Sequence, residues 1–150
     1  MTSSGTPPKL ELGRGASIGA PSETHLIELG RQLSDRVAVG DIIRLNGPLG
    51  AGKTTLVRGL LWGLGHEGAV KSPTYTLLEP YDLPWGLVYH FDLYRIADPD
   101  ELDLIGFAEL TDGRALCLIE WPERGGHYVP ETGLRIDLDV EGSGRHLRIS

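Results

Sequence analysis

The sequence predicts a single-domain α/β fold of three layers, in which a mixed central sheet lies between layers of helices. Segments with helical spacing of apolar residues alternate with short apolar runs rich in β-forming residues, which is the pattern of parallel strands joined by helices. Two alternating segments near the C-terminus flank a turn and add an antiparallel hairpin, so the sheet is mixed. The length of 150 residues suits one compact domain.

The first twenty residues predict a flexible N-terminal tail that precedes a domain spanning residues 21–150. They are rich in Gly, Pro, Ser and Thr and carry few large apolar side chains. A segment of this kind buries too little apolar surface to offset the entropy lost on ordering it. Removal of residues 1–20 is therefore expected to leave thermal stability nearly unchanged.

The first helix is predicted to begin after Ser22, because serine at the N-cap with Glu23 in the first turn is a helix start signal. Residues 41–46 then predict a buried strand, and a glycine-rich loop follows it. Residues 54–64 have the apolar spacing of a second helix, which Gly65 closes. The first helix shows the same spacing at Leu26, Leu29 and Leu33.

The rest of the chain predicts further strands and one short helix. The helix begins near Asp98, where proline and acidic residues occupy its first turn. The segment 70–81 holds two prolines and is expected to be a strand that an ordered loop precedes or interrupts. The remaining strands are expected at residues 87–93, 115–121, 134–140 and 146–149.

Residues 47–54 read GPLGAGKT and match the phosphate-binding pattern G-x-x-x-x-G-K-[ST]. The glycines allow left-handed backbone angles, so the backbone N–H groups can approach phosphate oxygens. Lys53 supplies a positive charge to the β- and γ-phosphates, and the hydroxyl of Thr54 is placed to ligate magnesium. The N-terminus of the following helix adds its positive dipole end.

The sequence thus predicts a P-loop NTPase-like fold, with ATP and magnesium as its cofactors. No N/T-K-x-D guanine motif is present, which mildly favours ATP over GTP. The residues of this segment expected to contact the nucleotide are Gly47, Leu49, Gly50, Ala51, Gly52, Lys53, Thr54 and Thr55.

Two acidic residues are candidates for the metal ligand and for the hydrolysis machinery. Asp92 ends the run VYHFD and Glu120 ends the run LCLIE, so each acid follows an apolar strand. Ligand sites of α/β proteins lie at the carboxyl ends of strands, and P-loop enzymes place a metal-binding acid there. Lys53, Asp92 and Glu120 are therefore the candidate catalytic residues. The alternative for both carboxylates is a solvated acid at the end of a strand.

Three further positions carry a weaker signal. Residues 72–76, SPTYT, fit either a switch loop that senses a γ-phosphate or a turn that enters a strand. His90 lies two residues before Asp92, where a lone histidine is more often structural than catalytic. Trp121 follows Glu120 and either packs over the site or belongs to the core.

In combination, these segments resemble the TsaE (YjeE) family of bacterial ATPases, which act in threonylcarbamoyladenosine modification of tRNA. The resemblance rests on four blocks in order, which read GPLGAGKTT, VKSPTYTLLEPY, VYHFDLYRIADPDELDLIGF and LCLIEWPE. With the first helix, they cover residues 22–125. The phosphate loop alone indicates a superfamily, whereas the succession of SPTYT, HFDLYR and IEWPE is far more specific.

The resemblance implies a small P-loop α/β fold with weak intrinsic ATPase activity. It also implies partners, TsaB and TsaD, whose complex transfers threonylcarbamoyl onto the adenosine next to the tRNA anticodon. By match of motif, Thr54 and Glu120 would hold magnesium, and Asp92 would belong to the hydrolysis machinery. The residues that the resemblance places around the nucleotide are Thr74 in the switch region, Trp121 and, at the start of the first helix, Glu23.

The formal charge of −7 argues against direct, tight binding of tRNA, because contacts to nucleic-acid phosphates require clustered Lys and Arg. A partner is therefore expected to hold the tRNA. No window has the roughly 18 consecutive apolar residues of a membrane span, and the N-terminus lacks a secretory signal. The expected location is the cytoplasm. The single cysteine, Cys117, lies in an apolar run and is expected to be buried.

The sequence is compatible with three functions, which are an ATPase that drives a tRNA-modifying complex, a small P-loop kinase and a nucleotide-sensing binding module. A kinase requires an arginine-bearing lid, and the chain has Arg124 but no Arg-rich lid segment. The sensor differs from the ATPase mainly in its rate of turnover, which the sequence does not define. The ATPase is the preferred interpretation.

Overall fold

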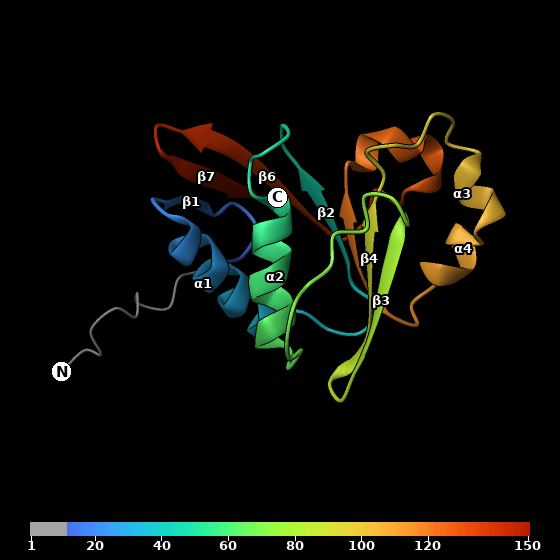
Figure 1. Cartoon of the computed structure of the whole chain (residues 1–150), viewed down its shortest axis with the longest axis horizontal. Helices are drawn as coiled ribbons and strands as arrows, with labels where there is room; N and C mark the ends of the chain where they lie inside the picture. The colour runs from blue at the N-terminus through green and yellow to red at the C-terminus, as the bar shows by residue number, and fades with distance from the viewer. Residues whose placement is uncertain (1–11) are drawn as a thin grey trace.

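A seven-stranded mixed sheet forms the centre of the computed structural model, which describes residues 12–150 (Figure 1). Its strands are β1 (Ser17–Ala20), β2 (Ile42–Asn46), β3 (Leu78–Leu83), β4 (Gly86–Asp92), β5 (Leu116–Glu120), β6 (Leu134–Glu141) and β7 (Gly144–Ile149). They lie in the order β1-β7-β6-β2-β5-β4-β3. The central pairs β6–β2, β2–β5 and β5–β4 are parallel, whereas β1–β7, β7–β6 and β4–β3 are antiparallel.

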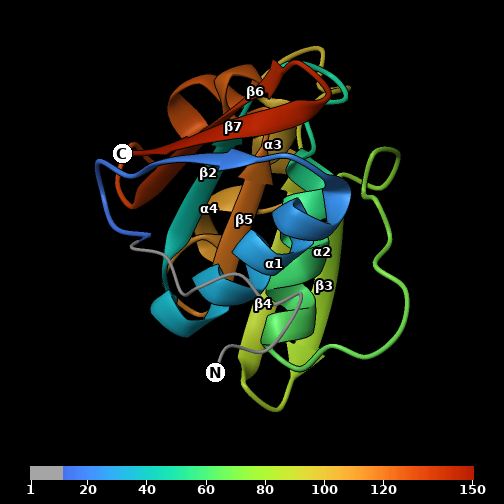
Figure 2. The same ribbon diagram turned by 90° about the vertical axis from the view of Figure 1, so that its left-hand side faces the viewer.

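Two layers of helices enclose the sheet. The helices α1 (Glu23–Leu33) and α2 (Lys53–Gly63) cover the face that Figure 2 turns toward the viewer, and the 3₁₀ turn η1 (Ser34–Arg36) continues α1. The short helices α3 (Glu101–Leu104) and α4 (Phe107–Leu110) and the 3₁₀ segment η2 (Pro122–Tyr128) cover the other face. Each face of the sheet holds its own apolar cluster. The predicted three-layer α/β fold with a mixed sheet is confirmed.

Alternation along the central strands determines which acids face α2. In β5, Leu118 belongs to the cluster beneath α1 and α2, and Ile119 belongs to the cluster on the opposite face. Glu120 therefore shares the face of Leu118. Asp92 lies directly opposite Glu120 in the parallel register of β4 and β5. Both strands consequently present a carboxylate at their C-terminal ends, on the side of α2.

The helices α1 and α2 pack backbone against backbone. A Cβ atom on Gly59 of α2 would lie 2.1 Å from the carbonyl oxygen of Ile27 in α1. One on Gly30 of α1 would lie 2.4 Å from the carbonyl oxygen of Leu56 in α2. A larger residue at either position would force the helices apart, because a packed interface has no room for an extra methyl group. The two glycines therefore set how closely the start of α1 approaches the phosphate loop.

β1 corrects the prediction of a flexible tail over residues 1–20. Residues 1–11 lie outside the described part of the chain, but Ser17–Ala20 pair with β7. Leu12 is 2% exposed and Ala20 is 1% exposed, and both belong to the cluster beneath α1 and α2. The prediction was wrong for this stretch because a four-residue edge strand shows too little alternation to be recognised. Its partner strand, β7, begins only at Gly144, so the pairing joins opposite ends of the sequence and leaves no local signal.

Deletion of residues 1–20 is therefore expected to destabilise the protein. The truncation removes the buried Leu12 side chain and the pairing of β1 with β7. Burial of one leucine contributes about 2 kcal/mol, so we expect the free energy of unfolding in urea to fall by about that amount or more. The variant Leu12→Ala should reproduce part of the loss. An unchanged urea midpoint for the truncated chain would show that β1 does not stabilise the edge of the sheet.

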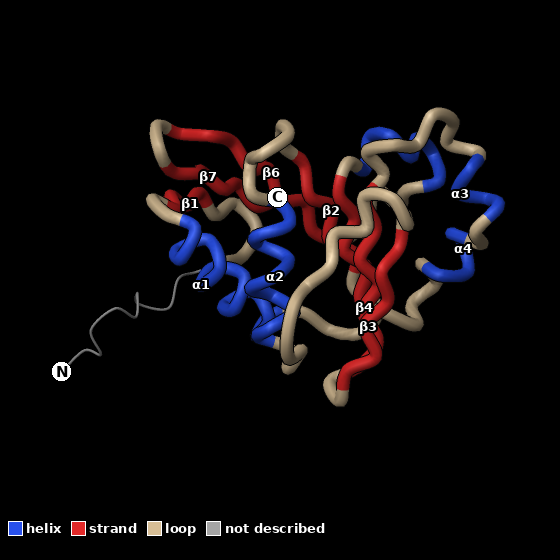
Figure 3. Tube along the Cα trace, viewed as in Figure 1, coloured by secondary structure: helices blue, strands red, loops and turns tan. Residues whose placement is uncertain are grey.

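Most other elements were predicted from the sequence, but some of their bounds differ in the structure. Ser22 caps α1 as predicted, since its side chain accepts a hydrogen bond from the N–H of His25 at 3.3 Å. The strand predicted over residues 70–81 begins only at Leu78. The preceding residues form the loop that Figure 3 shows between α2 and β3, and this loop contains Pro73. Leu77 ends it with a φ of 70°, a left-handed angle that interrupts an extended strand.

Two short helical segments were not predicted. α4 and η2 each start from a residue with left-handed backbone angles, Gly106 with a φ of 72° and Trp121 with a φ of 56°. Segments this short do not establish a helical period in the sequence.

Cys117 is buried as predicted, and burial raises the pKa of its thiol to about 12.

Candidate functional site

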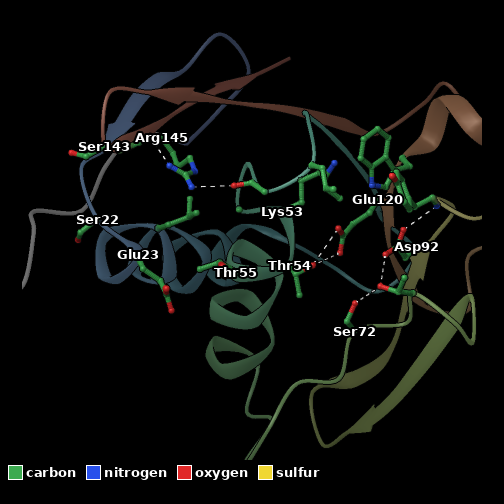
Figure 4. Close-up of a pocket in the computed structure, with 18 of the residues that line it drawn as sticks. Ser22, Glu23, Lys53, Thr54, Thr55, Ser72, Asp92, Glu120, Ser143 and Arg145 are labelled. Atoms are coloured by element: carbon green, nitrogen blue, oxygen red, sulfur yellow. Dashed lines mark hydrogen bonds between the residues drawn. The ribbon is translucent and has the colours of Figure 1, made fainter.

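A cavity of about 620 Å³ lies beside the C-terminal ends of β4 and β5. Its walls are the phosphate loop, the first turn of α1, the loop that contains Ser72 and Thr74, the two strand ends and the turn between β6 and β7 (Figure 4). The carboxyl ends of strands are where open α/β sheets bind their ligands. The fold therefore brings the sequence-predicted segments to one place.

The phosphate loop has a conformation that depends on glycine. Gly50 and Gly52 have φ values of 79° and 101°, in the left-handed region that disfavours other residues. A Cβ atom on Gly52 would lie 2.4 Å from the side chain of Leu26, and one on Gly47 would lie 2.4 Å from the carbonyl oxygen of Leu138. The loop is thus closely enclosed by its neighbours and forms a cradle before the N-terminus of α2.

Lys53 lies inside the cavity rather than in solvent. It is 5% exposed, its Nζ donates a hydrogen bond to the carbonyl oxygen of Gly47, and Nζ lies 3.5 Å from the centroid of the Trp121 ring. Burial lowers the pKa of Lys53, and the charges of nearby acids, Glu120 first among them, oppose that change. The lysine is therefore a desolvated cation, held by a carbonyl oxygen and an aromatic face.

Thr54 and Glu120 are in direct contact. The Thr54 hydroxyl lies 3.1 Å from Oε2 and 3.3 Å from Oε1 of Glu120. Glu120 is 3% exposed, so this carboxylate is not the solvated strand-end acid of the alternative interpretation. Nε2 of His90 lies 2.6 Å from Oε2 of Glu120. Through these two contacts, Glu120 links the first turn of α2 to the C-terminal parts of β4 and β5.

Asp92 connects the second strand end to the loop before β3. The hydroxyl of Thr74 donates to its Oδ2 at 3.3 Å, and the N–H of Tyr94 donates to its Oδ1 at 3.0 Å. The hydroxyls of Ser72 and Thr74 lie 2.8 Å apart. Burial raises the pKa of Asp92, and the hydrogen bond from Tyr94 partly opposes that change. A raised carboxyl pKa suits a group that takes up a proton near neutral pH.

Trp121 forms part of the cavity wall, and it owes this position to unusual backbone angles. Its φ of 56° and ψ of 49° turn the chain sharply after β5. The centroid of its indole ring lies 4.9 Å from the centroid of the Tyr94 ring. The guanidinium carbon of Arg124 lies 5.5 Å from the Trp121 ring centroid. The sequence left two placements open, and Trp121 meets both, since it lines the cavity and packs against the apolar cluster on the face of α3 and α4.

Most of the predicted site residues line this single cavity. Gly47 and Ala51 do not line the cavity. Ala51 is fully buried, and Gly47 contacts Lys53 through its carbonyl oxygen. The predicted residues that line the cavity are Glu23, Leu49, Gly50, Gly52, Lys53, Thr54, Thr55, Thr74, Asp92, Glu120 and Trp121.

The turn between β6 and β7 adds a part of the site that the sequence analysis missed. Ser143, Gly144 and Arg145 line the cavity. Nη2 of Arg145 donates to the carbonyl oxygen of Gly50 at 3.0 Å, so the last strand contacts the phosphate loop. The sequence offered one signal for this contact, a basic residue just after a hairpin turn, and that signal is too common to identify a site.

The oxygen donors in the cavity fit magnesium. Mg²⁺ prefers oxygen ligands, keeps several waters and is held by one or two carboxylates together with substrate phosphates. The hydroxyl of Thr54 and the carboxylate of Glu120 are such donors, and they lie beside the phosphate loop. No group of three or more His, Cys, Asp and Glu residues within residues 12–150 has the geometry of an all-protein metal site. The Thr54 hydroxyl and the Glu120 carboxylate are donors of the kind that hold Mg²⁺ together with phosphates.

Across residues 12–150, no helix has both the length and the apolar character needed to cross a membrane.

Comparison with known proteins gives consistent matches over nearly the whole chain. The family model described as "Threonylcarbamoyl adenosine biosynthesis protein TsaE" matches residues 20–147. The tRNA threonylcarbamoyladenosine biosynthesis protein TsaE of Haemophilus influenzae is 41% identical over 134 residues, which cover 86% of this chain and 85% of that protein. The protein of the same name from Treponema pallidum is 42% identical over 105 residues, which cover 70% and 77%.

The crystal structure of YdiB from Bacillus subtilis has the same fold. The two structures superpose with a TM-score of 0.76 at 24% sequence identity, over 92% of this chain and 86% of that chain. Every residue that lines the cavity falls within the span of the family match.

Proposed function

The chain belongs to the TsaE family of threonylcarbamoyladenosine biosynthesis proteins, and from this premise we propose that it is a magnesium-dependent ATPase that serves tRNA modification through a TsaB–TsaD complex. The observation that carries the proposal is the contact between the Thr54 hydroxyl and the Glu120 carboxylate beside the phosphate loop. The contact unites the loop hydroxyl with an acid from a neighbouring strand. Phosphoryl-transfer sites of P-loop proteins use this pair to hold their metal.

Four polar side chains of the cavity have roles in binding the nucleotide and its metal in this proposal. The N–H groups of the loop and the Lys53 ammonium would hold the phosphates, with Lys53 exchanging the Gly47 carbonyl oxygen for phosphate oxygens. Thr54 and Glu120 would hold Mg²⁺, which when bound neutralises the charge that develops on the transferred phosphate. Glu23, whose side chain is 69% exposed, lies on the opposite wall and would contact the nucleoside.

Asp92 would act as the base for the attacking water. It lines the same cavity as Lys53 and Glu120, and burial raises its pKa toward the range in which a carboxylate accepts a proton effectively. The Thr74 hydroxyl holds one oxygen of Asp92. A change in the loop around Thr74 would therefore reach the base directly, as expected of a switch segment.

Calorimetric titration with ATP and with GTP, in the presence of Mg²⁺, tests the proposal together with a phosphate-release assay. We expect magnesium-dependent ATP binding and slow hydrolysis. Binding without any turnover, even with the partner complex present, would support the nucleotide sensor. Transfer of the γ-phosphate to a metabolite would support the kinase. Absence of ATP binding would contradict the proposal.

Addition of the TsaB–TsaD complex is expected to accelerate ATP turnover. Arg95 and Arg145 line the cavity, but Arg95 lies 4.4 Å from the Tyr75 ring centroid and Arg145 is bonded to Gly50. Both guanidinium groups already have a partner, so these two arginines offer no free charge of the arginine-finger type, which can contribute about 10³–10⁵ in rate. Turnover measured with and without the complex checks this, and fast turnover that the complex leaves unchanged would contradict it.

The isolated chain is expected not to bind tRNA measurably at physiological salt. Its formal charge is −7, and affinity for nucleic acid depends on phosphate neutralisation by Lys and Arg. A gel shift with tRNA at controlled salt, with the TsaB–TsaD complex as the positive control, checks this. Tight binding by the chain alone would mean that it reaches tRNA without a partner.

A further inference from the structure

His90 is a fully buried polar residue whose side chain has one hydrogen-bond partner among the described residues, Glu120. It is 0% exposed and lies on β4 between Val88 and Asp92, on the face that α1 and α2 cover. Its Nε2 lies 2.6 Å from Oε2 of Glu120. Its Nδ1 is buried and has no hydrogen-bond partner in the part of the chain that the structure describes.

The lone contact fixes which ring nitrogen carries the proton. If the proton were on Nδ1 alone, the ring would bury that unpaired donor and would face the Glu120 carboxylate with a lone pair. Because a carboxylate oxygen accepts, Nε2 carries a proton and donates to Oε2 of Glu120.

This bond distinguishes the two oxygens of the Glu120 carboxylate. Oε2 accepts from His90 at 2.6 Å and lies 3.1 Å from the Thr54 hydroxyl. Oε1 lies 3.3 Å from the same hydroxyl, which is the longest of the three contacts. His90 thus fixes one oxygen of a carboxylate that would otherwise rotate about its last bond, and Oε1 remains the more available oxygen.

Packing alone does not account for a histidine at this position. Its neighbour on β5 is Leu118, and Val88 precedes it on the same face, so the sheet is apolar on these two sides, whereas its neighbour on β3 is the half-buried Glu79. An apolar side chain of similar volume would fill this space without burying an unpaired nitrogen. The bond to Glu120 is the one side-chain hydrogen bond that the imidazole makes among residues 12–150.

We propose that His90 is a positioning residue that orients the Glu120 carboxylate for Mg²⁺, a role that rests on the proposed function of this cavity. Residues that hydrogen-bond a metal ligand orient it and tune its affinity, and their loss typically costs about 10- to 100-fold in metal affinity. His90 does not itself line the cavity, so its effect reaches the site through Glu120.

Three substitutions at His90 and one matched control test the proposal. His90→Phe keeps a ring of similar size without the donor. His90→Gln places an amide N–H where Nε2 lies, whereas the amide of His90→Asn is one carbon too short. Val88→Ala is the control, since Val88 is equally buried on the same strand and face but makes no polar contact with Glu120.

The measurement is calorimetric titration with ADP over a series of Mg²⁺ concentrations and in EDTA, which requires no turnover. We expect His90→Phe and His90→Asn to raise the Mg²⁺ concentration for half-maximal gain in ADP affinity by about tenfold or more. Affinity in EDTA should stay at the parent value. His90→Gln should lie closer to the parent than His90→Asn, and Val88→Ala should match the parent.

The outcomes separate this proposal from the function on which it rests. A parent chain whose ADP affinity does not respond to Mg²⁺ contradicts the magnesium site and, with it, the role of His90. If the parent responds to Mg²⁺ and His90→Phe responds in the same way, only the role of His90 is overturned. The same holds if Val88→Ala is shifted as much as His90→Phe. If His90→Phe does not fold, the comparison of Gln with Asn decides, and equal Mg²⁺ dependence of that pair overturns the proposal.

Discussion

Replacement of Glu120 by glutamine is expected to remove most ATP hydrolysis while measurable ATP binding remains. The amide keeps the shape of the carboxylate, and its oxygen can still accept the hydrogen bond from His90, so the buried site survives. The change removes the negative charge that we propose holds Mg²⁺ beside Thr54. Metal ions supply several kcal/mol of charge stabilisation in such transition states, so we expect a loss of about 100-fold in turnover.

Phosphate release at varied Mg²⁺ concentration measures this effect. The matched control is Glu109→Gln, which makes the same chemical change at an exposed position on α4. We expect the control to hydrolyse at the parent rate. If Glu120→Gln also keeps the parent rate and its magnesium dependence, Glu120 is not the metal acid, and Asp92 is the remaining candidate in the cavity.

Replacement of Lys53 by alanine is expected to abolish tight nucleotide binding and to leave the fold intact. The ammonium is desolvated and held between the Gly47 carbonyl oxygen and the Trp121 ring, so it is already in the cavity before a phosphate arrives. A hydrogen bond that involves a charged group is worth roughly 1.5–3 kcal/mol, which corresponds to a loss of about 10- to 150-fold in affinity.

Calorimetric titration with ATP and Mg²⁺ measures the loss, and circular dichroism confirms the fold. Lys71→Ala is the matched control, since Lys71 is exposed, and only its backbone groups contact Tyr81. We expect Lys71→Ala to bind ATP like the parent. An equal affinity for Lys53→Ala would contradict phosphate binding at this loop.

Local signals predicted the parts of the structure that depend on neighbouring residues. The serine cap of α1 and the order of loop and helix at residues 47–54 are encoded within a few positions. Asp92 and Glu120 could each be proposed as a site residue because each ends an apolar strand, and the structure places the two side by side in register. These predictions required only periodicity, turn chemistry and the rule that ligands bind at strand ends.

The remaining features depend on which distant segments pair. β1 has an ordered place only because β7 runs beside it, and Arg145 reaches the phosphate loop only because β7 follows β6 at that edge. The bond from His90 to Glu120 depends on how β4 aligns with β5, since a shift of one residue would turn the imidazole to the other face. A single sequence does not contain these alignments, which is why His90 was expected to be structural.

The close packing of α1 and α2 has a consequence for evolution. Gly30 and Gly59 do not line the cavity beside β4 and β5, and a methyl group at either would collide with the backbone of the other helix. Both positions are therefore expected to accept substitutions as rarely as the phosphate loop does, although selection acts on them through the spacing of the helices rather than through chemistry. An alignment of relatives should show glycine at both sites even where the exposed surfaces of the same helices have diverged completely.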